Sequence, residues 1–158
     1  MKELQSVLGN ALRTRAEVRR KLGAFDGAES DIDEAITCQR TATISGDPEA
    51  TVRLADALVE LARLRLARSD LSGVDGWLSD AERTYQRLQT DYPERDFAGE
   101  IADLTLARGE IEEARANDAN AIKLFQKALA SAPPSARELR RRASGALDRA
   151  TAKSRSRP

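Results

Sequence analysis

Charged side chains recur at helical spacing and are the first candidates for chemistry in this chain. Asp96, Glu100 and Asp103 follow one another at i, i+4 and i+7, which predicts one face of a helix. An offset of 40 residues matches Asp56 and Glu60 to the first two of these positions. Such a line of carboxylates would attract a basic peptide, although an ordinary solvated helix face is the commoner meaning of a charge line.

The same alignment extends the line to a groove across several helices. At the offset of 40, Arg63 replaces the third carboxylate, and an offset of 39 adds Glu17 from an earlier helix. Arg53 continues the polar line in the segment that contains Asp56. The predicted partner-binding groove residues are Glu17, Arg53, Asp56, Glu60, Arg63, Asp96, Glu100 and Asp103.

A second candidate surface is the basic C-terminal segment. Residues 134–158 hold eight Lys or Arg and two Asp or Glu, whereas the first 133 residues hold 18 and 24. The predicted basic surface consists of Arg137, Arg140, Arg141, Arg142 and Arg149. Clustered positive charge attracts phosphate, but no aromatic residue interleaves with these arginines to stack on a base. A solubilising cap and tail is the simpler interpretation, and nucleic-acid binding remains an alternative.

Residues that catalysis usually requires are missing. The chain has no His, and its one cysteine, Cys38, has no partner for an intramolecular disulfide or a cysteine zinc site. No phosphate-binding glycine loop, dinucleotide fingerprint or nucleophile elbow occurs. The sequence therefore predicts no catalytic residue, no cofactor and no metal, and a non-enzymatic protein.

The elements that must position these residues are helices. Ala, Leu, Arg and Glu are abundant, aromatic residues are scarce, and apolar residues recur at helical spacing. Asp47-Pro48-Glu49 is a strong helix start, and Ser135-x-x-Glu138 is a capping box. The predicted helices cover roughly residues 3–22, 30–45, 48–68, 70–91, 94–108, 110–132 and 135–150, followed by a disordered basic tail over 151–158.

One stretch of the chain occurs twice and indicates an internal repeat. Residues 61–71, LARLRLARSDL, match residues 101–111, IADLTLARGEI, at an offset of 40. The offset also matches Tyr85 to Phe125, and Pro93 to Pro133. A fixed period of this length predicts an all-α fold, an α-solenoid of three antiparallel helix pairs over residues 1–150 with a C-terminal capping helix. A plain helical bundle is the alternative, but a bundle requires no repeat.

Several short motifs resemble the tetratricopeptide repeat family in its long-repeat form, as in bacterial regulators and kinesin light chains. The resemblance covers about residues 3–133, although the usual repeat of about 34 residues is shorter. The motifs are Leu8-Gly9-x-x-Leu12, Asp31-Ile32-x-x-Ala35, Asp70-Leu71, Ala81-x-x-x-Tyr85, Gly109-Glu110-Ile111-x-x-Ala114 and Ala121-x-x-x-Phe125.

The resemblance implies a scaffold that binds a protein or peptide, possibly a basic one, in a groove lined by the first helix of each pair. A homo-oligomer is a further possibility. No apolar run reaches membrane-spanning length and no signal peptide is evident, so a cytoplasmic location without a membrane partner is expected.

Overall fold

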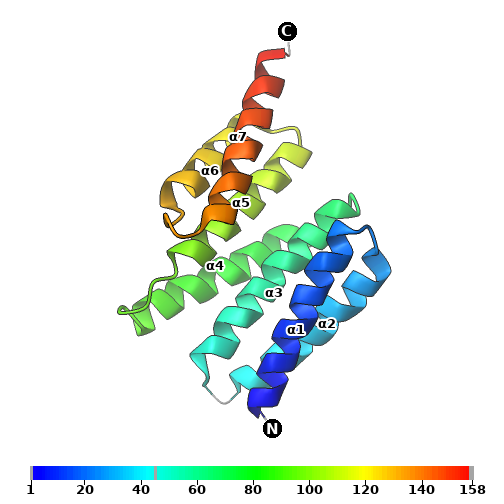
Figure 1. Ribbon diagram of the computed structural model, residues 1–158, viewed down its shortest axis with the longest axis vertical. Helices are drawn as coiled ribbons and strands as arrows, with labels where there is room; N and C mark the ends of the chain where they lie inside the picture. The colour runs from blue at the N-terminus through cyan, green and yellow to red at the C-terminus, as the bar shows by residue number, and fades with distance from the viewer. Residues whose placement is uncertain (1, 45, 157–158) are drawn as a thin grey trace. The chain divides into compact units, whose positions relative to one another are not determined.

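The computed structural model describes residues 2–44 and 46–156, and this part of the chain contains helices and no strand. The predicted all-α fold is confirmed. The helices are α1 (Lys2–Lys21), α2 (Phe25–Thr43), α3 (Pro48–Ala67), α4 (Val74–Asp91), α5 (Ala98–Ala114), α6 (Asp118–Ser131) and α7 (Arg137–Ser156) (Figure 1).

The chain divides into two compact units, whereas the sequence predicted one domain over residues 1–150. The first unit is Met1–Tyr92 and the second is Pro93–Pro158. In the first, α1 packs on α2, α2 on α3 and α3 on α4, and α1 also contacts α3. In the second, α6 packs on both α5 and α7, and α5 also contacts α7. Each unit thus stacks consecutive helices, and each helix pair is a hairpin.

The start of α3 follows the capping chemistry that the sequence predicted, whereas α5 and α2 begin at other residues than predicted. Asp47 caps α3 as expected, because its side chain accepts a hydrogen bond of 2.9 Å from the Glu49 amide. Helix α5 starts at Ala98, four residues later than predicted, and the Asp96 carboxylate accepts from the Ala98 amide at 2.8 Å. Helix α2 starts at Phe25 rather than at residue 30.

The largest boundary error concerns Gly109, which was predicted to separate two helices, and Glu110, which was predicted to begin the second of them. Both residues lie inside α5, which continues to Ala114. The turn comes later, where Ala116 adopts the left-handed conformation with a φ of +61°. A glycine inside a helix costs stability, but Gly109 lies directly against the Phe125 ring, where a larger residue does not fit.

The repeat has a longer period than the sequence predicted. Three left-handed residues follow the first helix of each pair, namely Gly23, Ser69 and Ala116, and they are 46 and 47 residues apart. Buried residues recur with the same period rather than at 39–40 residues. The corresponding sets are Ala16, Ala62 and Gly109; Ala28, Val74 and Ala121; Ile32, Leu78 and Phe125; and Ala35, Ala81 and Ala128.

The predicted offset of 40 therefore aligns buried helix faces with buried helix faces, but it pairs residues that do not correspond in the structure. The difference of seven residues is about two helical turns, so the two registers place the same residues inside. Leu64 and Leu104 are both buried, as expected, although they are not equivalent. In the register of the structure, Leu64 corresponds to Ile111, which is also buried.

Helix α7 extends six residues beyond the point where the sequence predicted a disordered tail. It runs through Ser156 and buries Ala143, Ala146 and Ala150 in the core of the second unit. Lys153 lies in this extension, and its Nζ is 3.0 Å from Oδ1 of the buried Asp118 on α6. Residue 45, and residues 157 and 158 of the predicted tail, lie outside the described part of the chain.

Candidate functional site

Two carboxylates predicted to line a groove hold helices together in the first unit. Glu60 on α3 is buried, and its Oε1 accepts a hydrogen bond of 2.6 Å from Nε of Arg20 on α1. Asp56, one turn earlier, accepts a bond of 2.6 Å from the Tyr85 hydroxyl on α4. These two acids therefore tie α3 to α1 and to α4.

The other predicted groove residues of this unit are also engaged. Glu17 pairs with Lys21 on the same helix at 2.6 Å. Burial is the largest single influence on the pKa of Glu17 and raises it, but hydrogen bonding to Lys21 opposes burial and the pKa is lowered overall. Arg53 donates to Oγ of Ser6 at 2.7 Å, and Arg63 is buried. With a period of 46 residues Glu17 corresponds to Arg63, so it does not continue the acidic line.

The acidic triplet of the second unit does not form one helical face. Asp96 is exposed and lies before α5, and its carboxylate accepts a hydrogen bond from the amide of Ala98, the first residue of the helix. Glu100 lies half-buried in the first turn of α5. Asp103 on α5 accepts a hydrogen bond of 3.2 Å from Arg142 on α7. The prediction that these three residues follow helical spacing is wrong, because the helix starts after the first of them.

Most arginines of the predicted basic surface bind groups within their own unit. Arg140 donates to the carbonyl oxygens of Leu129 and Ala132 at 3.1 and 2.9 Å, and so caps the end of α6. Arg142 lies 3.2 Å from Asp103 and 3.4 Å from Glu110.

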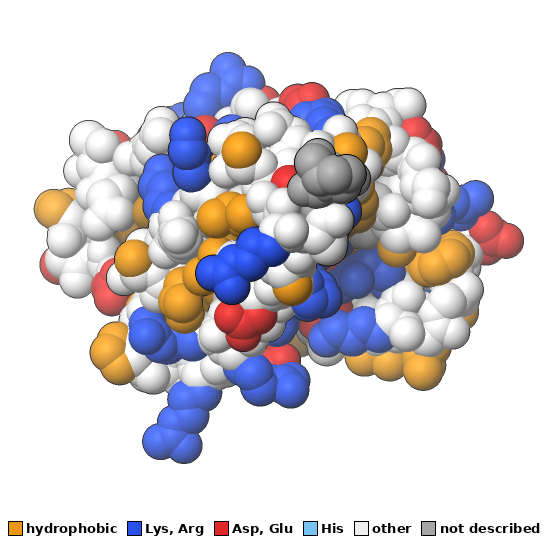
Figure 2. All heavy atoms as spheres, turned by 90° about the horizontal axis from the view of Figure 1, so that it is seen from above, with side chains coloured by type: hydrophobic (Ala, Val, Ile, Leu, Met, Phe, Trp, Pro, Cys, Tyr) orange, Lys and Arg blue, Asp and Glu red, His pale blue; other side chains and the backbone are white. Residues whose placement is uncertain are grey.

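The remaining basic candidates are more exposed. Arg141 pairs with Glu138 at 2.8 Å, Arg149 lies 3.9 Å from Glu113, and Arg137 is exposed. On the face drawn in Figure 2, basic side chains are interspersed with acidic and hydrophobic ones. A charge pattern of this kind gives little support to the nucleic-acid alternative, which needs a continuous basic surface.

Sequence reasoning missed a buried ion pair between α1 and α2. Asp31 is buried, and its two carboxylate oxygens lie 2.7 Å from Arg15 and 2.7 Å from Arg19. The hydrogen bond from Arg15 lowers the pKa of Asp31, although burial opposes this shift. The Arg15 side chain is half-exposed, and its guanidinium binds Asp31. The motif Asp31-Ile32-x-x-Ala35 gave no indication that Asp31 binds Arg15 and Arg19.

A second buried polar group explains an irregular position in α2. Gln39 was predicted to pack poorly because it falls on the apolar stripe of its helix. Its Nε2 donates to the Ser6 carbonyl at 2.9 Å, and its Oε1 accepts from the Ser6 hydroxyl at 3.3 Å. Gly9 leaves the space for this amide, because a Cβ there would lie 2.6 Å from Nε2 of Gln39.

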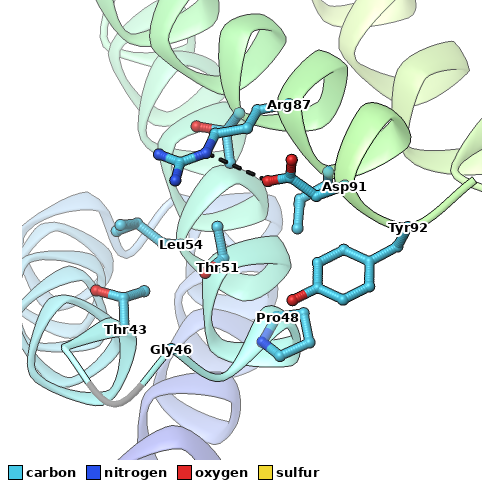
Figure 3. A pocket seen from close by; sticks show the side chains of 10 residues that line it. Thr43, Gly46, Pro48, Thr51, Leu54, Arg87, Asp91 and Tyr92 are labelled. Carbon is cyan, nitrogen blue, oxygen red and sulfur yellow. Dashed lines mark hydrogen bonds and ion pairs between the residues drawn. The ribbon is translucent and has the colours of Figure 1, made fainter.

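The first unit also contains an open hollow of about 340 Å³ between the end of α2, the start of α3 and the end of α4 (Figure 3). Arg87 and Asp91 pair along α4 on one wall of the hollow at 3.4 Å, and Arg87 is largely exposed whereas Asp91 is half-exposed. The hydroxyls of Thr51 and Thr84 donate to backbone carbonyls of Asp47 and Asp80. The hollow therefore offers a polar wall but no nucleophile with an adjacent base.

The first helix carries an apolar face that the first unit leaves uncovered. We define the α1 stripe as Leu4, Leu8, Ala11, Arg15, Val18 and Leu22. The exposed fractions are 70% for Leu4, 44% for Leu8, 51% for Val18 and 78% for Leu22, and the adjacent Val7 is 61% exposed. Leu22 continues the helical turn, because its amide donates to the Val18 carbonyl at 3.0 Å.

Such a concentration of exposed large apolar side chains on one helix is uncommon on the surface of a monomeric protein. The opposite side of α1 packs into the unit through Leu12 and Ala16, which are buried. The apolar periodicity of the sequence predicted a helix here but did not distinguish the exposed positions Leu4, Leu8, Val18 and Leu22 from the buried ones. Periodicity reports apolar faces and does not distinguish a face covered by the same chain from one left open.

Other features of the described residues add no chemical site. No three His, Cys, Asp or Glu side chains within residues 2–44 and 46–156 converge in a way that would hold a metal ion. In the same residues, no helix has both the length and the apolar character needed to cross a membrane. Cys38 is buried, and burial raises the pKa of its thiol, which makes it a weak nucleophile.

Comparisons with known proteins give no assignment of family or function for this chain. No protein-family model matches the chain, and no curated protein and no solved structure matches it.

Proposed function

We propose that this protein is a non-enzymatic interaction scaffold of the tetratricopeptide-like type, which binds a helix or peptide of a partner protein. The observation that carries the proposal is the α1 stripe, where four large apolar side chains are between 44% and 78% exposed. Exposure of an apolar helix face to water costs free energy, and a partner helix that docks on this face removes the cost. Recognition through such a face uses apolar anchors one turn apart.

The charged candidates contribute to the scaffold rather than to recognition. Glu60 and Asp56 join α3 to its neighbours, and Asp103 is joined to α7 through Arg142. A basic peptide would have to compete with these internal partners. We therefore assign recognition to the apolar stripe and not to the acidic line that the sequence predicted.

The repeat architecture supports the same proposal. Within the first unit, the hairpins α1–α2 and α3–α4 pack on each other and support the helix that presents the α1 stripe. The repeat period of 46 to 47 residues exceeds the usual tetratricopeptide length, so we propose a likeness of architecture rather than membership of a subfamily. A cytoplasmic location belongs to the proposal, supported by the single cysteine, which has no second cysteine to pair with in the chain.

Affinity capture from the native host, followed by mass spectrometry, tests the proposal. The wild-type chain is compared with the double variant Leu4→Gln/Leu22→Gln and with Ile44→Gln. Ile44 is 80% exposed and lies at the end of α2, outside the stripe, so it is a matched control.

We expect proteins that the wild type and Ile44→Gln retain and the stripe variant loses. Their retention should change little between about 50 mM and about 0.5 M salt, because apolar contacts are less salt-sensitive than phosphate contacts. Identical capture by all three chains, with no self-association through the stripe, would contradict the proposal. Capture of nucleic acid that is lost at high salt would instead favour the basic C-terminal segment.

A further inference from the structure

The spacing of the α1 stripe is symmetric about its middle. Its six positions are separated by 4, 3, 4, 3 and 4 residues, so the spacing is the same when read from either end. This alternation is the a and d spacing of a coiled coil. A stripe that matches its own reverse fulfils the condition for a two-fold interface, in which both copies use the same surface.

We propose that the occupant of the α1 stripe is the α1 stripe of a second copy of this chain, packed antiparallel about a two-fold axis between Ala11 and Arg15. This inference rests on the proposed function and identifies the partner helix. Reversal of the stripe brings Leu4 opposite Leu22 of the second copy and Leu8 opposite its Val18. The largest and most exposed apolar side chains at the two ends of the stripe, Leu4 and Leu22, thereby cover each other.

The middle of the stripe also fits the antiparallel arrangement of two copies. Ala11 faces Arg15 of the second copy, so a small residue lies opposite the alkyl stem of a long one. The guanidinium of Arg15 is already bound by Asp31 of its own chain, at 2.9 Å from Nε and 2.7 Å from Nη2. Its charge is therefore matched before association, and the contact buries no unpaired ion.

Residues beside the stripe complement each other across the axis. In the antiparallel arrangement Val7 lies near Lys21 of the second copy, and Gln5 lies near its Arg19. Thr14 lies near the same threonine of the second copy. Each of these neighbours combines a neutral side chain with a basic or neutral one, so none of these flanking pairs brings two like charges together.

The size of the stripe suits a weak, reversible dimer. The stripe from Leu4 to Leu22 extends about 27 Å along a helix about 10 Å in diameter. A seam of that length buries on the order of 1,000 Å² in total, near the lower limit for specific interfaces. The dimer should therefore form in a concentration-dependent way.

Sedimentation equilibrium of the full chain tests the association. The monomer mass is 17.3 kDa. We expect the wild type and Ile44→Gln to approach twice that mass as concentration rises, and Leu4→Gln/Leu22→Gln to stay monomeric. Circular dichroism should show the same helix content in all three, since the substituted side chains are exposed. A wild type that stays monomeric up to about 1 mM, the range of the weakest specific complexes, or a dimer that persists in the stripe variant, would overturn the inference.

Disulfide trapping tests the orientation. In a Cys38→Ala background, one chain carries Leu4→Cys and a second chain carries Leu22→Cys. Mild oxidation should cross-link the mixture into a heterodimer, whereas each chain alone should remain largely uncrosslinked. Self-crosslinking of Leu4→Cys alone would indicate a parallel or unrelated contact and contradict the antiparallel seam. A monomeric wild type whose stripe still captures another protein would remove this inference and leave the proposed function standing.

Discussion

At Gly109 the backbone of α5 approaches α6 so closely that a side chain has no room. A Cβ placed there would lie 2.6 Å from Cδ1 of Phe125 and 3.3 Å from Cβ of Leu124. Phe125 is fully buried in the core of the second unit, so its ring cannot move away without repacking. The contact explains why a helix contains glycine where alanine would favour helix formation.

We therefore expect Gly109→Ala to destabilise the protein by about 1–3 kcal/mol through overpacking. Gly99→Ala is the matched control, because Gly99 also lies in α5 but has no neighbour within 4 Å of the added Cβ. That control should leave stability unchanged or raise it by up to about 1 kcal/mol. Urea denaturation of both variants measures the difference, and equal effects at the two glycines would show that α5 and α6 do not meet as described.

Single residues also mark what the sequence could not predict. Gly109 was interpreted as a turn because its helix-breaking tendency is local information, whereas its neighbour Phe125 is a tertiary contact. Ala116 does form the turn, with a positive φ. Glycine or asparagine would have indicated such a turn in the sequence, whereas alanine does not. The cap at Asp47 was predicted correctly because capping depends only on adjacent residues.

At the scale of helices, the α1–α2 hairpin depends on a carboxylate that titrates outside the physiological range. Asp31 of α2 binds Arg15 and Arg19 of α1, and its pKa lies below the ordinary value, mainly because of the hydrogen bond from Arg15. Since the folded-state pKa is lowered, the stabilisation is fully present above the unfolded pKa of about 3.9. It is lost as the pH falls through the lower, folded value.

Asp31→Asn should therefore reduce stability at neutral pH by about 1.5–3 kcal/mol, the range for hydrogen bonds to charged groups. The difference between wild type and variant should shrink as the pH falls below about 4. Asp33→Asn is the control, because Asp33 lies on the same helix and is exposed. Thermal unfolding followed across pH measures both, and a pH-independent loss for Asp31→Asn would point to packing rather than to the ion pair.

Helix α7 carries the clearest difference from the prediction at this scale. The sequence predicted disorder from residue 151 because the basic, small residues there bury little surface, yet Lys153 reaches the buried Asp118. We expect Lys153→Gln to lower the melting temperature, since it weakens the pairing of a buried charge. Arg155→Gln, two residues further along the helix and exposed, should have no effect. Equal behaviour of the two variants would indicate that the helical extension adds nothing to the fold.

At the scale of the whole chain, the number of helices and their faces could be predicted, whereas the repeat register could not. Leu64 and Leu104 were correctly expected to be buried, and the error of seven residues left both inside. Hydrophobic periodicity identifies a face and is nearly blind to shifts of two turns. The uncovered face of α1 was missed for a related reason, because spacing does not tell whether an apolar face is covered by the same chain.

The division into two units gives a prediction for the first of them. Residues 1–92 contain α1 to α4 and their mutual contacts, so a chain of these residues should be helical and unfold cooperatively by circular dichroism. A shorter chain ending at residue 67 lacks α4, including the buried Leu78 and Tyr85. It should lose cooperativity, because α3 is left without that cover. A non-cooperative transition in the 92-residue chain would show that the division does not correspond to a folding unit.

The near-equivalence of helix faces after seven residues bears on how this chain can change in length. Each residue turns a helix by about 100°, so removing five residues rotates everything that follows by about 140°. Removing seven rotates it by only about 20° and shortens the helix by about 10 Å. Insertions and deletions of seven residues inside a helix are therefore the ones that a repeat array absorbs most easily. Copies of such a repeat can drift apart in length by whole heptads while their buried positions remain recognisable, and other length changes belong in the turns.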